Sequence, residues 1–218
     1  MSRLLLVRHG ESLWNSERRI QGHQDSGLSP TGRLQTERLA DRLKGRSFGA
    51  LYSSSSQRAK ESAEILSAAV GLPVHLRDDL REIRLGRWEG KTVQEIEEED
   101  GDLYQRWLTR PLEATPPGGE GLVPFQKRIV TALEGIRDAH PEQDVLIVTH
   151  AGAIRAYVSF ILDLDLNRIF TLKIDNTALS EVLFAKGVPT LSLFNDTCHL
   201  LSLDKSIDRP KELSIPVF

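Results

Sequence analysis

Residues 4–15 read LLLVRHGESLWN, an apolar run that ends abruptly at Arg8 and His9. Four successive apolar residues without polar alternation are typical of a strand buried on both faces, as in a parallel sheet that helices cover. A second such run, VLIV over residues 145–148, is followed by Thr149 and His150. Two buried strands that lead into histidines indicate that the carboxyl edge of a parallel sheet carries the chemistry of this protein.

Strands and helices alternate along the chain. The segment FGALYS, residues 48–53, is a third candidate strand. Helical spacing of apolar residues predicts four helices: one that begins at Pro30 after an N-cap at Ser29, one over 59–70 that ends at Gly71, one over 125–136, and one over 154–161. This alternation indicates an α/β protein, and we expect a three-layer α/β/α sandwich with a mostly parallel central sheet. Residues 179–195 predict a hairpin around Lys186 and Gly187 at a sheet edge.

One region interrupts this alternation. Residues 84–121 contain an acidic helical stretch, an aromatic patch and the loop TPPGGEG. We interpret them as a small lid-like excursion over one edge of the sheet, within a single domain that spans residues 1–218. Trp88 and Trp107 either pack inside this lid or stack on the leaving group of a substrate. Residues 205–218 are polar and contain prolines, so we expect them to be mobile.

The composition restricts the compartment and the partners. The net charge is −3 and no basic block occurs, so we expect no nucleic acid and no membrane as partner. A single cysteine, Cys198, excludes an internal disulfide framework and fits a reducing compartment. The N-terminal sequence leaves no room for a signal peptide, and no apolar stretch approaches the ~20 residues that span a bilayer. We therefore expect a cytoplasmic protein, and the sheet edge after Leu179 is compatible with a homodimer.

Four side chains are expected to meet at the carboxyl edge of the sheet. Arg8 and His9 follow the first strand, His150 follows the VLIV strand, and Arg58 lies at the start of the helix after LYSS. Helix N-termini at this edge present free N–H groups, and arginine binds oxyanions in a bidentate way, so the rim suits phosphate. Histidines that follow strands are also common as structural, hydrogen-bonded residues. Spacing alone leaves a phosphate site and this structural role equally acceptable.

A series of motifs favours the phosphate site. LVRHGESLWN resembles the signature of the histidine phosphatase superfamily, the phosphoglycerate mutase-like enzymes. The resemblance continues in order through IQGHQDSGLSPTG, LYSSSSQRAKESAEIL, LREIRLGRWEG, PGGEG, VTHAGAIRA and NDTCHL, and it covers about residues 3–200. Ser12 stands where the family signature has threonine, and it keeps the hydroxyl group.

This resemblance implies covalent catalysis through a phosphohistidine. His9 would be the nucleophile, and Arg8, Arg58 and His150 would surround the phosphoryl oxygens. Asn15, Gln21 and Gly22 match positions that line the phosphate pocket of the family, and Ser12 is expected to join them. Ala151 and Gly152, at the helix start after His150, are also expected to bind the phosphate or substrate.

Glu82, in LREIRLGRWEG, matches the acid/base residue of the family. It would protonate the leaving oxygen and then deprotonate the water that attacks the phosphohistidine. Without the motif, an ion pair with Arg81 or Arg84 would be the simpler interpretation of this side chain. The sequence contains no HExxH, no paired-cysteine spacing and no GxxxxGK loop, so we expect no metal and no cofactor.

The remaining histidines give weaker signals. His23 follows Gly22 in the second motif, and it either approaches the substrate or lies in a solvated loop. The family's NDTxHL ending suggests that Asn195 and His199 support the site. His75 and His140 are expected to be structural or exposed.

The excursion after Glu82 distinguishes branches of the superfamily. Cofactor-dependent phosphoglycerate mutases read NERxYG at this motif and carry a longer insertion, whereas this chain reads REIRLGRWEG and has only a compact excursion. It resembles the bacterial broad-specificity and α-ribazole-phosphate phosphatases more closely, which implies a small phosphomonoester as substrate. A mutase is the first alternative, and a non-catalytic phosphate-binding module on the same fold is the second. The sequence does not choose among sugar phosphates, phosphoglycerate, phosphoserine, nucleotides and α-ribazole phosphate.

Overall fold

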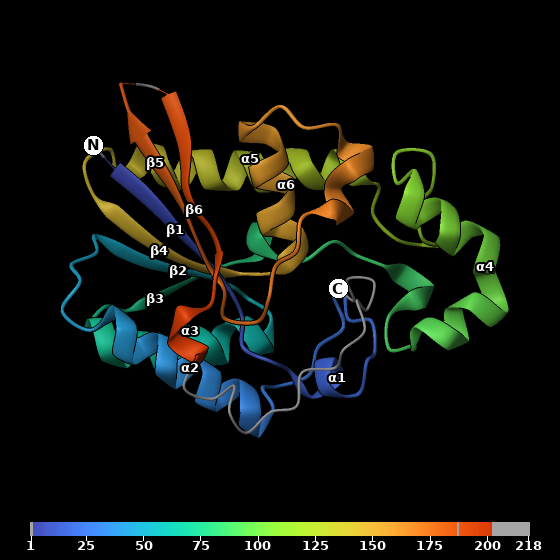
Figure 1. Ribbon diagram of the computed structural model, residues 1–218, viewed down its shortest axis with the longest axis horizontal. Helices are drawn as coiled ribbons and strands as arrows, with labels where there is room; N and C mark the ends of the chain where they lie inside the picture. The colour runs from blue at the N-terminus through green and yellow to red at the C-terminus, as the bar shows by residue number, and fades with distance from the viewer. Residues whose placement is uncertain (1, 187, 202–218) are drawn as a thin grey trace.

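The computed structural model describes residues 2–186 and 188–201, and it contains one six-stranded sheet with the order β3-β2-β4-β1-β5-β6 (Figure 1). The strands are β1 (Ser2–Arg8), β2 (Ala50–Ser54), β3 (Val74–Arg77), β4 (Asp144–Thr149), β5 (Leu179–Ala185) and β6 (Val188–Asp196). The β1–β4, β2–β4 and β2–β3 pairs are parallel, whereas β5 is antiparallel to both β1 and β6. The carboxyl ends of four neighbouring strands therefore meet at one edge.

In the described part of the chain, six α-helices connect and cover these strands. They are α1 (Leu13–Ser16), α2 (Pro30–Leu43), α3 (Gln57–Val70), α4 (Val93–Thr109), α5 (Leu122–Ala139) and α6 (Ala151–Ile161). Short 3₁₀ helices lie at Asp78–Leu80, Gly86–Trp88, Leu166–Thr171 and Cys198–Leu200. The three predicted strands, the four predicted helices and the hairpin strands are all present, whereas β3 and α1 were not predicted.

Local sequence signals determine where α2 begins and where α3 ends. Ser29 accepts a hydrogen bond from the Gly32 N–H and so caps α2, whose first residue is Pro30. Gly71 ends α3 with φ at 72°, in the left-handed region that glycine adopts without steric cost. Both predicted helix boundaries are confirmed.

The strand β1 shows how the sheet divides the core. Leu4 and Leu6 belong to a cluster with side chains of α5 and α6, whereas Leu5 and Val7 belong to a cluster with α2 and α3. Because side chains alternate along a strand, a run without polar residues fits a strand that is covered on both faces. Figure 1 shows one helix pair on each side of the sheet, and the expected three-layer sandwich is confirmed.

The excursion over residues 84–121 lies beyond the carboxyl ends of the parallel strands (Figure 1). Its helix α4 packs against the 3₁₀ helix Leu166–Thr171. Trp88 and Trp107 are buried, and their ring centroids lie 6.4 Å apart in an edge-to-face arrangement. These indoles therefore pack inside the excursion, and the prediction that they stack on a leaving group is not supported by their burial.

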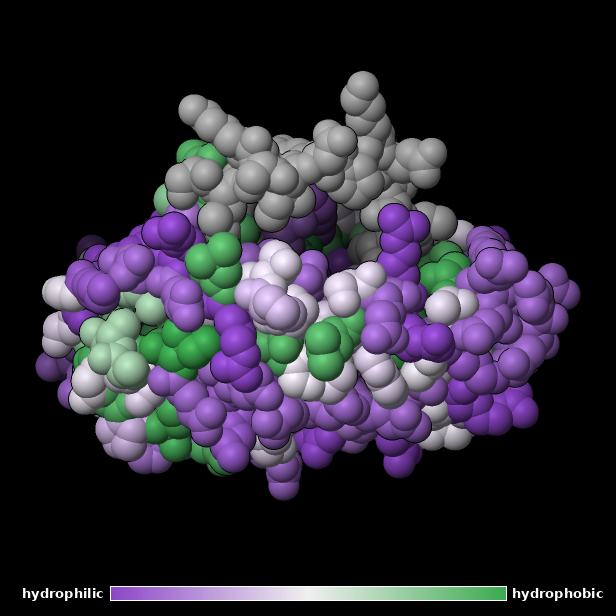
Figure 2. All heavy atoms as spheres, turned by 90° about the horizontal axis from the view of Figure 1, so that it is seen from below, coloured by the Kyte–Doolittle hydropathy of each residue, from purple (hydrophilic) through white to green (hydrophobic). Residues whose placement is uncertain are grey.

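Two predictions fall on parts of the chain outside the described residues: the hairpin turn at Gly187 and the segment 205–218. Figure 2 views the molecule from the side of α2 and α3, and this face is largely hydrophilic with scattered hydrophobic residues. Within residues 2–186 and 188–201, no helix has the length and apolar character needed to cross a membrane.

Candidate active site

His9 lies at the end of β1, and its ring is fixed by its own neighbour. Its Nδ1 atom lies 2.7 Å from the carbonyl oxygen of Gly10. A carbonyl only accepts hydrogen bonds, so Nδ1 carries the proton and Nε2 carries a lone pair. The side chain is buried, and this burial, with Arg58 and Arg8 nearby, lowers the pKa of His9 well below its ordinary value. His9 is therefore a neutral imidazole whose lone pair is on Nε2.

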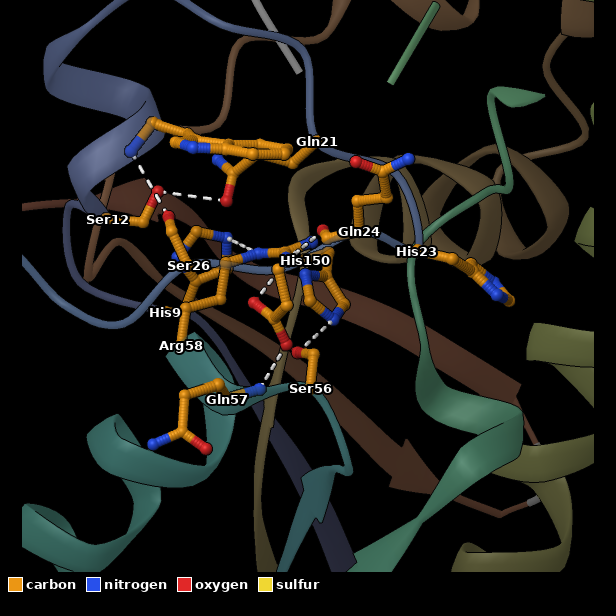
Figure 3. Close-up of polar contacts among 12 residues, drawn as sticks. His9, Ser12, Gln21, His23, Gln24, Ser26, Ser56, Gln57, Arg58 and His150 are labelled. Carbon is orange, nitrogen blue, oxygen red and sulfur yellow. Dashed lines mark hydrogen bonds and ion pairs between the residues drawn. The ribbon is translucent and has the colours of Figure 1, made fainter. Parts of the chain in front are cut away.

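Arg58, in the first turn of α3, lies directly against this nitrogen. Its Nε donates to Nε2 of His9 across 3.2 Å (Figure 3). Its Nη2 donates to the Gly22 carbonyl across 3.0 Å. Nη1 forms an ion pair with Oδ1 of Asp25 at 2.7 Å. Asp25 also accepts from the backbone N–H of Gln57, so it joins the start of α3 to the loop that follows α1. The guanidinium is thus held on three sides.

Arg8 keeps part of its hydrogen-bonding capacity unused. Its Nη1 donates to the carbonyl of Ile174 at 2.7 Å, whereas its buried Nε has no hydrogen-bond partner among the described residues. Burial lowers the pKa of Arg8 to about 10, so the group is still charged at neutral pH. An unpaired, buried cationic donor beside His9 is suited to an anionic ligand.

His150 follows β4 as the N-cap residue of α6. Its ring centroid lies 5.2 Å from that of His9, with the two ring planes at 63°. Its Nε2 lies 2.8 Å from Oγ of Ser54 and 3.2 Å from Oγ of Ser56, whereas its Nδ1 is buried and has no partner within the described chain. Burial, and then Arg58, lower the pKa of His150 well below its ordinary value.

The Glu82 carboxylate lies in the same region, held by backbone. Its Oε2 accepts from the N–H of Gly152 at 2.9 Å, and its Oε1 accepts from the N–H of Ile83 at 2.9 Å. Among the described residues, neither Arg81 nor Arg84 forms a salt bridge with it. The simpler ion-pair interpretation is therefore wrong, because the second residue of α6 supplies the contact.

The main chain of Glu82 is clamped as well. Its carbonyl oxygen lies 2.9 Å from Nε2 of His23 and 3.3 Å from Nη2 of Arg128. Arg128 also donates to the carbonyls of Asp79 and Arg81, at 3.0 and 2.9 Å. Burial lowers the pKa of His23, and so does the nearby Arg81. His23 is thus a hydrogen-bonded partner of the Glu82 segment, not a solvated loop residue.

The predicted pocket residues of the first loops form one network. Oγ of Ser12 donates to Oε1 of Gln21 at 2.9 Å (Figure 3). The same Oγ accepts from the N–H of Asn15 and so caps α1. Gly22 has φ at 57°, and a Cβ there would lie 2.3 Å from Oε1 of Glu89. Glu89, which sequence reasoning missed, accepts from three backbone N–H groups in residues 23–24 and 85.

The start of α6 differs from its prediction in one respect. Ala151 and Gly152 were both expected to line the phosphate pocket. Ala151 is buried at the first position of α6, but the N–H of Gly152 is engaged by Glu82. Gly152 therefore contacts the Glu82 carboxylate through its N–H group.

A further loop supports His9 from behind. Nδ2 of Asn176, which sequence reasoning missed, donates to the His9 carbonyl at 3.2 Å. On either side of Asn176, Asp175 exchanges hydrogen bonds with Asn195, and Oγ1 of Thr177 lies 3.0 Å from Nε2 of His199. Asn195 and His199 thus lie where their predicted supporting role requires. Asn176 precedes β5 in a segment without motif or periodicity, so only the fold reveals it.

Comparison with known proteins agrees with this geometry. Residues 4–197 match the family "Histidine phosphatase superfamily (branch 1)". Phosphoserine phosphatase 1 of Hydrogenobacter thermophilus is 34% identical over 200 residues, covering 92% of this chain and 95% of the relative. The structure of Bacillus stearothermophilus YhfR has a TM-score of 0.88 and 35% identity, with 92% of this chain and 100% of that chain covered.

A second solved structure carries a ligand. A phosphoserine phosphatase variant of Entamoeba histolytica in complex with phosphoserine has a TM-score of 0.83 and 30% identity, with 92% and 100% of the two chains covered. The family match spans most of the chain, and both the sequence and the structural similarity extend over nine tenths of it. The chain therefore belongs to the histidine phosphatase superfamily, branch 1, and is a phosphomonoester hydrolase.

Proposed function

We propose that this protein hydrolyses small phosphomonoesters through a phosphohistidine on His9, with Glu82 as general acid and base and without a metal ion. The state of His9 is the observation that carries the proposal. The Gly10 carbonyl binds the Nδ1 proton at 2.7 Å, which leaves the Nε2 lone pair beside a buried guanidinium. A neutral, oriented imidazole in a cationic pocket is suited to attack a phosphate ester.

The first step transfers the phosphoryl group to the enzyme. The Nε2 lone pair of His9 forms the N–P bond while the bond between phosphorus and the ester oxygen breaks. The protonated carboxyl group of Glu82 gives its proton to that oxygen, so the leaving group departs as a neutral alcohol. Arg8 and Arg58 stabilise the negative charge on the phosphoryl oxygens.

The second step returns the enzyme to its starting state. The Glu82 carboxylate takes a proton from water as the water oxygen attacks phosphorus and the N–P bond breaks. The products are inorganic phosphate and neutral His9, and Glu82 is protonated again. One residue serves both steps because the leaving oxygen and the attacking water occupy the same side of phosphorus.

The charged groups around the site support catalysis without a metal. Phosphoryl transfer requires mainly positioning and charge stabilisation. Arg8, Arg58 and Arg155 are buried and cationic, and burial lowers the pKa of Arg155 to about 10, which leaves it charged at neutral pH. These guanidinium groups can supply the charge that Mg²⁺ supplies in other phosphoryl-transfer enzymes.

Phosphoserine is the first substrate to test. Two of the proteins to which the chain is similar are named phosphoserine phosphatases, and they cover nine tenths of it. The leaving group of phosphoserine is an unactivated alkyl alcohol, which depends on protonation by a general acid. We therefore place it with other small alkyl phosphates in the proposed substrate class.

The decisive experiment traps the intermediate. Rapid acid or alkali quench of the enzyme with ³²P-labelled phosphoserine, in the presence of EDTA, should give a phosphoenzyme that is stable in alkali and labile in acid. His9→Ala should give neither label nor turnover. Label with slow release, together with interconversion of 2- and 3-phosphoglycerate, would identify a mutase. Turnover that survives in His9→Ala would overturn the phosphohistidine mechanism, and no label and no turnover in the wild type would favour the binding module.

A further inference from the structure

The two site histidines are held through different ring nitrogens and by different kinds of partner. His9 is held at Nδ1 by a carbonyl oxygen at 2.7 Å, which can only accept. His150 is held at Nε2 by two hydroxyl groups, those of Ser54 at 2.8 Å and Ser56 at 3.2 Å. A hydroxyl is able to donate, so both rings can carry their proton on Nδ1. The other nitrogen of His9 then presents a lone pair, whereas the unheld nitrogen of His150 presents a proton.

The Nδ1 atom of His150 is the ring nitrogen that is left for a ligand. Nδ1 is fully buried and has no hydrogen-bond partner within the described residues, although unpaired buried polar groups are costly. The ring lies edge-to-face with His9, with centroids 5.2 Å apart, so His150 borders the place where the phosphoryl group would lie. A polar atom left unpaired in a ligand pocket is expected to find its partner on the ligand.

We propose that Ser54 and Ser56 are positioning residues: their hydroxyl groups contact each other at 3.3 Å, and a hydroxyl of this pair donates to Nε2 and so holds His150 with its proton on Nδ1, from which it donates to a phosphoryl oxygen. The inference rests on the proposed function, because it needs a phosphoryl group in the pocket. Neither serine touches the substrate. They act by determining which ring nitrogen of His150 carries the proton.

The opposite tautomer fits an anion poorly. A proton on Nε2 would be donated to Ser54, and the Nδ1 lone pair would then face phosphoryl oxygens that also carry lone pairs. That arrangement adds repulsion in a buried site and leaves one acceptor unpaired. With the proton on Nδ1, both ring nitrogens have a partner once phosphate is bound.

The surrounding charges keep this donor neutral while the pocket is empty. Arg58, Arg8 and Arg81 face His150 together with the His9 ring, and burial and these cations oppose its protonation. A neutral histidine has a single proton for two nitrogens, so the choice of nitrogen must come from the hydrogen bonds. Figure 3 shows the Ser56 hydroxyl directed at the His150 ring, from the loop that precedes α3.

Nuclear magnetic resonance tests the proposal without relying on turnover. The full chain is labelled with ¹⁵N-histidine, saturated with inorganic phosphate at neutral pH, and the His150 signals are identified by their loss in His150→Gln. We expect a protonated, pyrrole-type Nδ1 and an unprotonated, pyridine-type Nε2. A proton on Nε2, or on both nitrogens, overturns the proposal; the tautomer itself is measured on the wild type, and the variant serves only to identify the signals.

Substitutions then test whether the serines set the tautomer. Ser54→Ala with Ser56→Ala should convert the His150 signals to a mixture of tautomers and lower kcat by about tenfold, less than the 10²–10³-fold expected for loss of a whole oxyanion donor. The matched control is Ser53→Ala, because Ser53 is equally buried in β2 but donates to the Ser54 carbonyl. Unchanged His150 signals in the double variant, or an equal change in the control, would contradict the proposal. Failure of the phosphohistidine mechanism would appear separately, as an unlabelled enzyme.

Discussion

Gly152 holds Glu82 in a space that only glycine leaves open. The N–H of Gly152 donates to Oε2 at 2.9 Å, while a Cβ on the same residue would lie 2.1 Å from Oε1. The carboxylate thus lies against the backbone at the start of α6, with a positive end of the helix dipole beneath it. The absence of a side chain at Gly152 therefore determines the position of the Glu82 carboxylate as much as the Gly152 hydrogen bond does.

Gly152→Ala is therefore expected to displace the Glu82 carboxylate. A contact of 2.1 Å cannot persist, and a shift of about 1 Å at a reacting group can lower the rate about 10²-fold. The variant should lose about this factor in kcat/KM towards alkyl phosphates. Gly135→Ala in α5 is the matched control, because a Cβ there meets nothing within 4 Å. It should keep activity and gain up to about 1 kcal/mol of stability. Full activity of Gly152→Ala would show that Glu82 needs no fixed position.

Glu82→Gln separates the proposed acid from a structural carboxylate. Glutamine keeps the size and one of the two hydrogen bonds from the N–H groups of Ile83 and Gly152, because its amide nitrogen cannot accept, and it has no proton to give to a leaving oxygen. We expect kcat/KM to fall by about 10²–10⁴-fold for phosphoserine, whose leaving group is poor. p-Nitrophenyl phosphate should be affected much less, because p-nitrophenolate leaves without protonation. Equal losses for both substrates would count against general acid catalysis.

The strands and the residues at their ends could be predicted from the sequence because both leave local signals. Leu4 to Val7 is apolar on both faces, and His9 follows directly. Buried strands and helix caps depend on a few neighbouring residues, so their periodicity is visible in the chain. The match of motifs then named Glu82, whose importance no local pattern reveals.

The supporting network could not be predicted in the same way. Asp25, Ser54 and Asn176 act through contacts with residues 33, 96 and 167 positions away. Such contacts depend on how the sheet brings distant loops together, and a serine in the run SSSS carries no mark of the one that contacts His150. Gly152 was expected to bind phosphate because a helix N-terminus favours an anion. The sequence does not show that the anion at this N-terminus is the Glu82 carboxylate.

Arg128 connects the carbonyl groups of Glu82 and of two residues before it to Glu120. Its guanidinium lies 2.7 Å from Oε2 of Glu120 and donates to the carbonyls of residues 79, 81 and 82. Arg128→Met should remove these contacts, lowering the free energy of unfolding by about 2 kcal/mol. It should also lower kcat/KM for alkyl phosphates more than for p-nitrophenyl phosphate, because the Glu82 segment loosens.

The control for Arg128 lies on the same helix. Arg137 forms ion pairs with Glu134 and Asp138 and stacks over Phe184, away from Glu82. Arg137→Met should cost less than about 1 kcal/mol, as for other half-exposed pairs, and leave the substrate preference unchanged. Urea unfolding and the two substrates measure both effects. An equal loss of activity in both variants would assign Arg128 a general structural role.

His199 should make the stability of the fold fall in acid. Burial, and then Arg42, lower its pKa to about 4, against about 6.5 in an unfolded chain. The unfolded state therefore binds the proton more tightly, and stability that is complete above pH 6.5 is lost as the pH falls towards 4. One such group changes the free energy of unfolding by at most about 1.4 kcal/mol per pH unit.

His199→Asn tests this assignment. Asparagine can still donate to Oγ1 of Thr177, which itself donates to the Asn176 carbonyl, but it does not titrate. Urea unfolding of both proteins at pH 8 measures the cost of the altered hydrogen bond. As the pH falls from 6.5 to 4.5, the wild type should lose stability faster than the variant, so the difference between them should shrink. Parallel curves over this range would mean that His199 is not the titrating group and that His9, His23 or His150, whose pKa values are also lowered, carry the acid sensitivity.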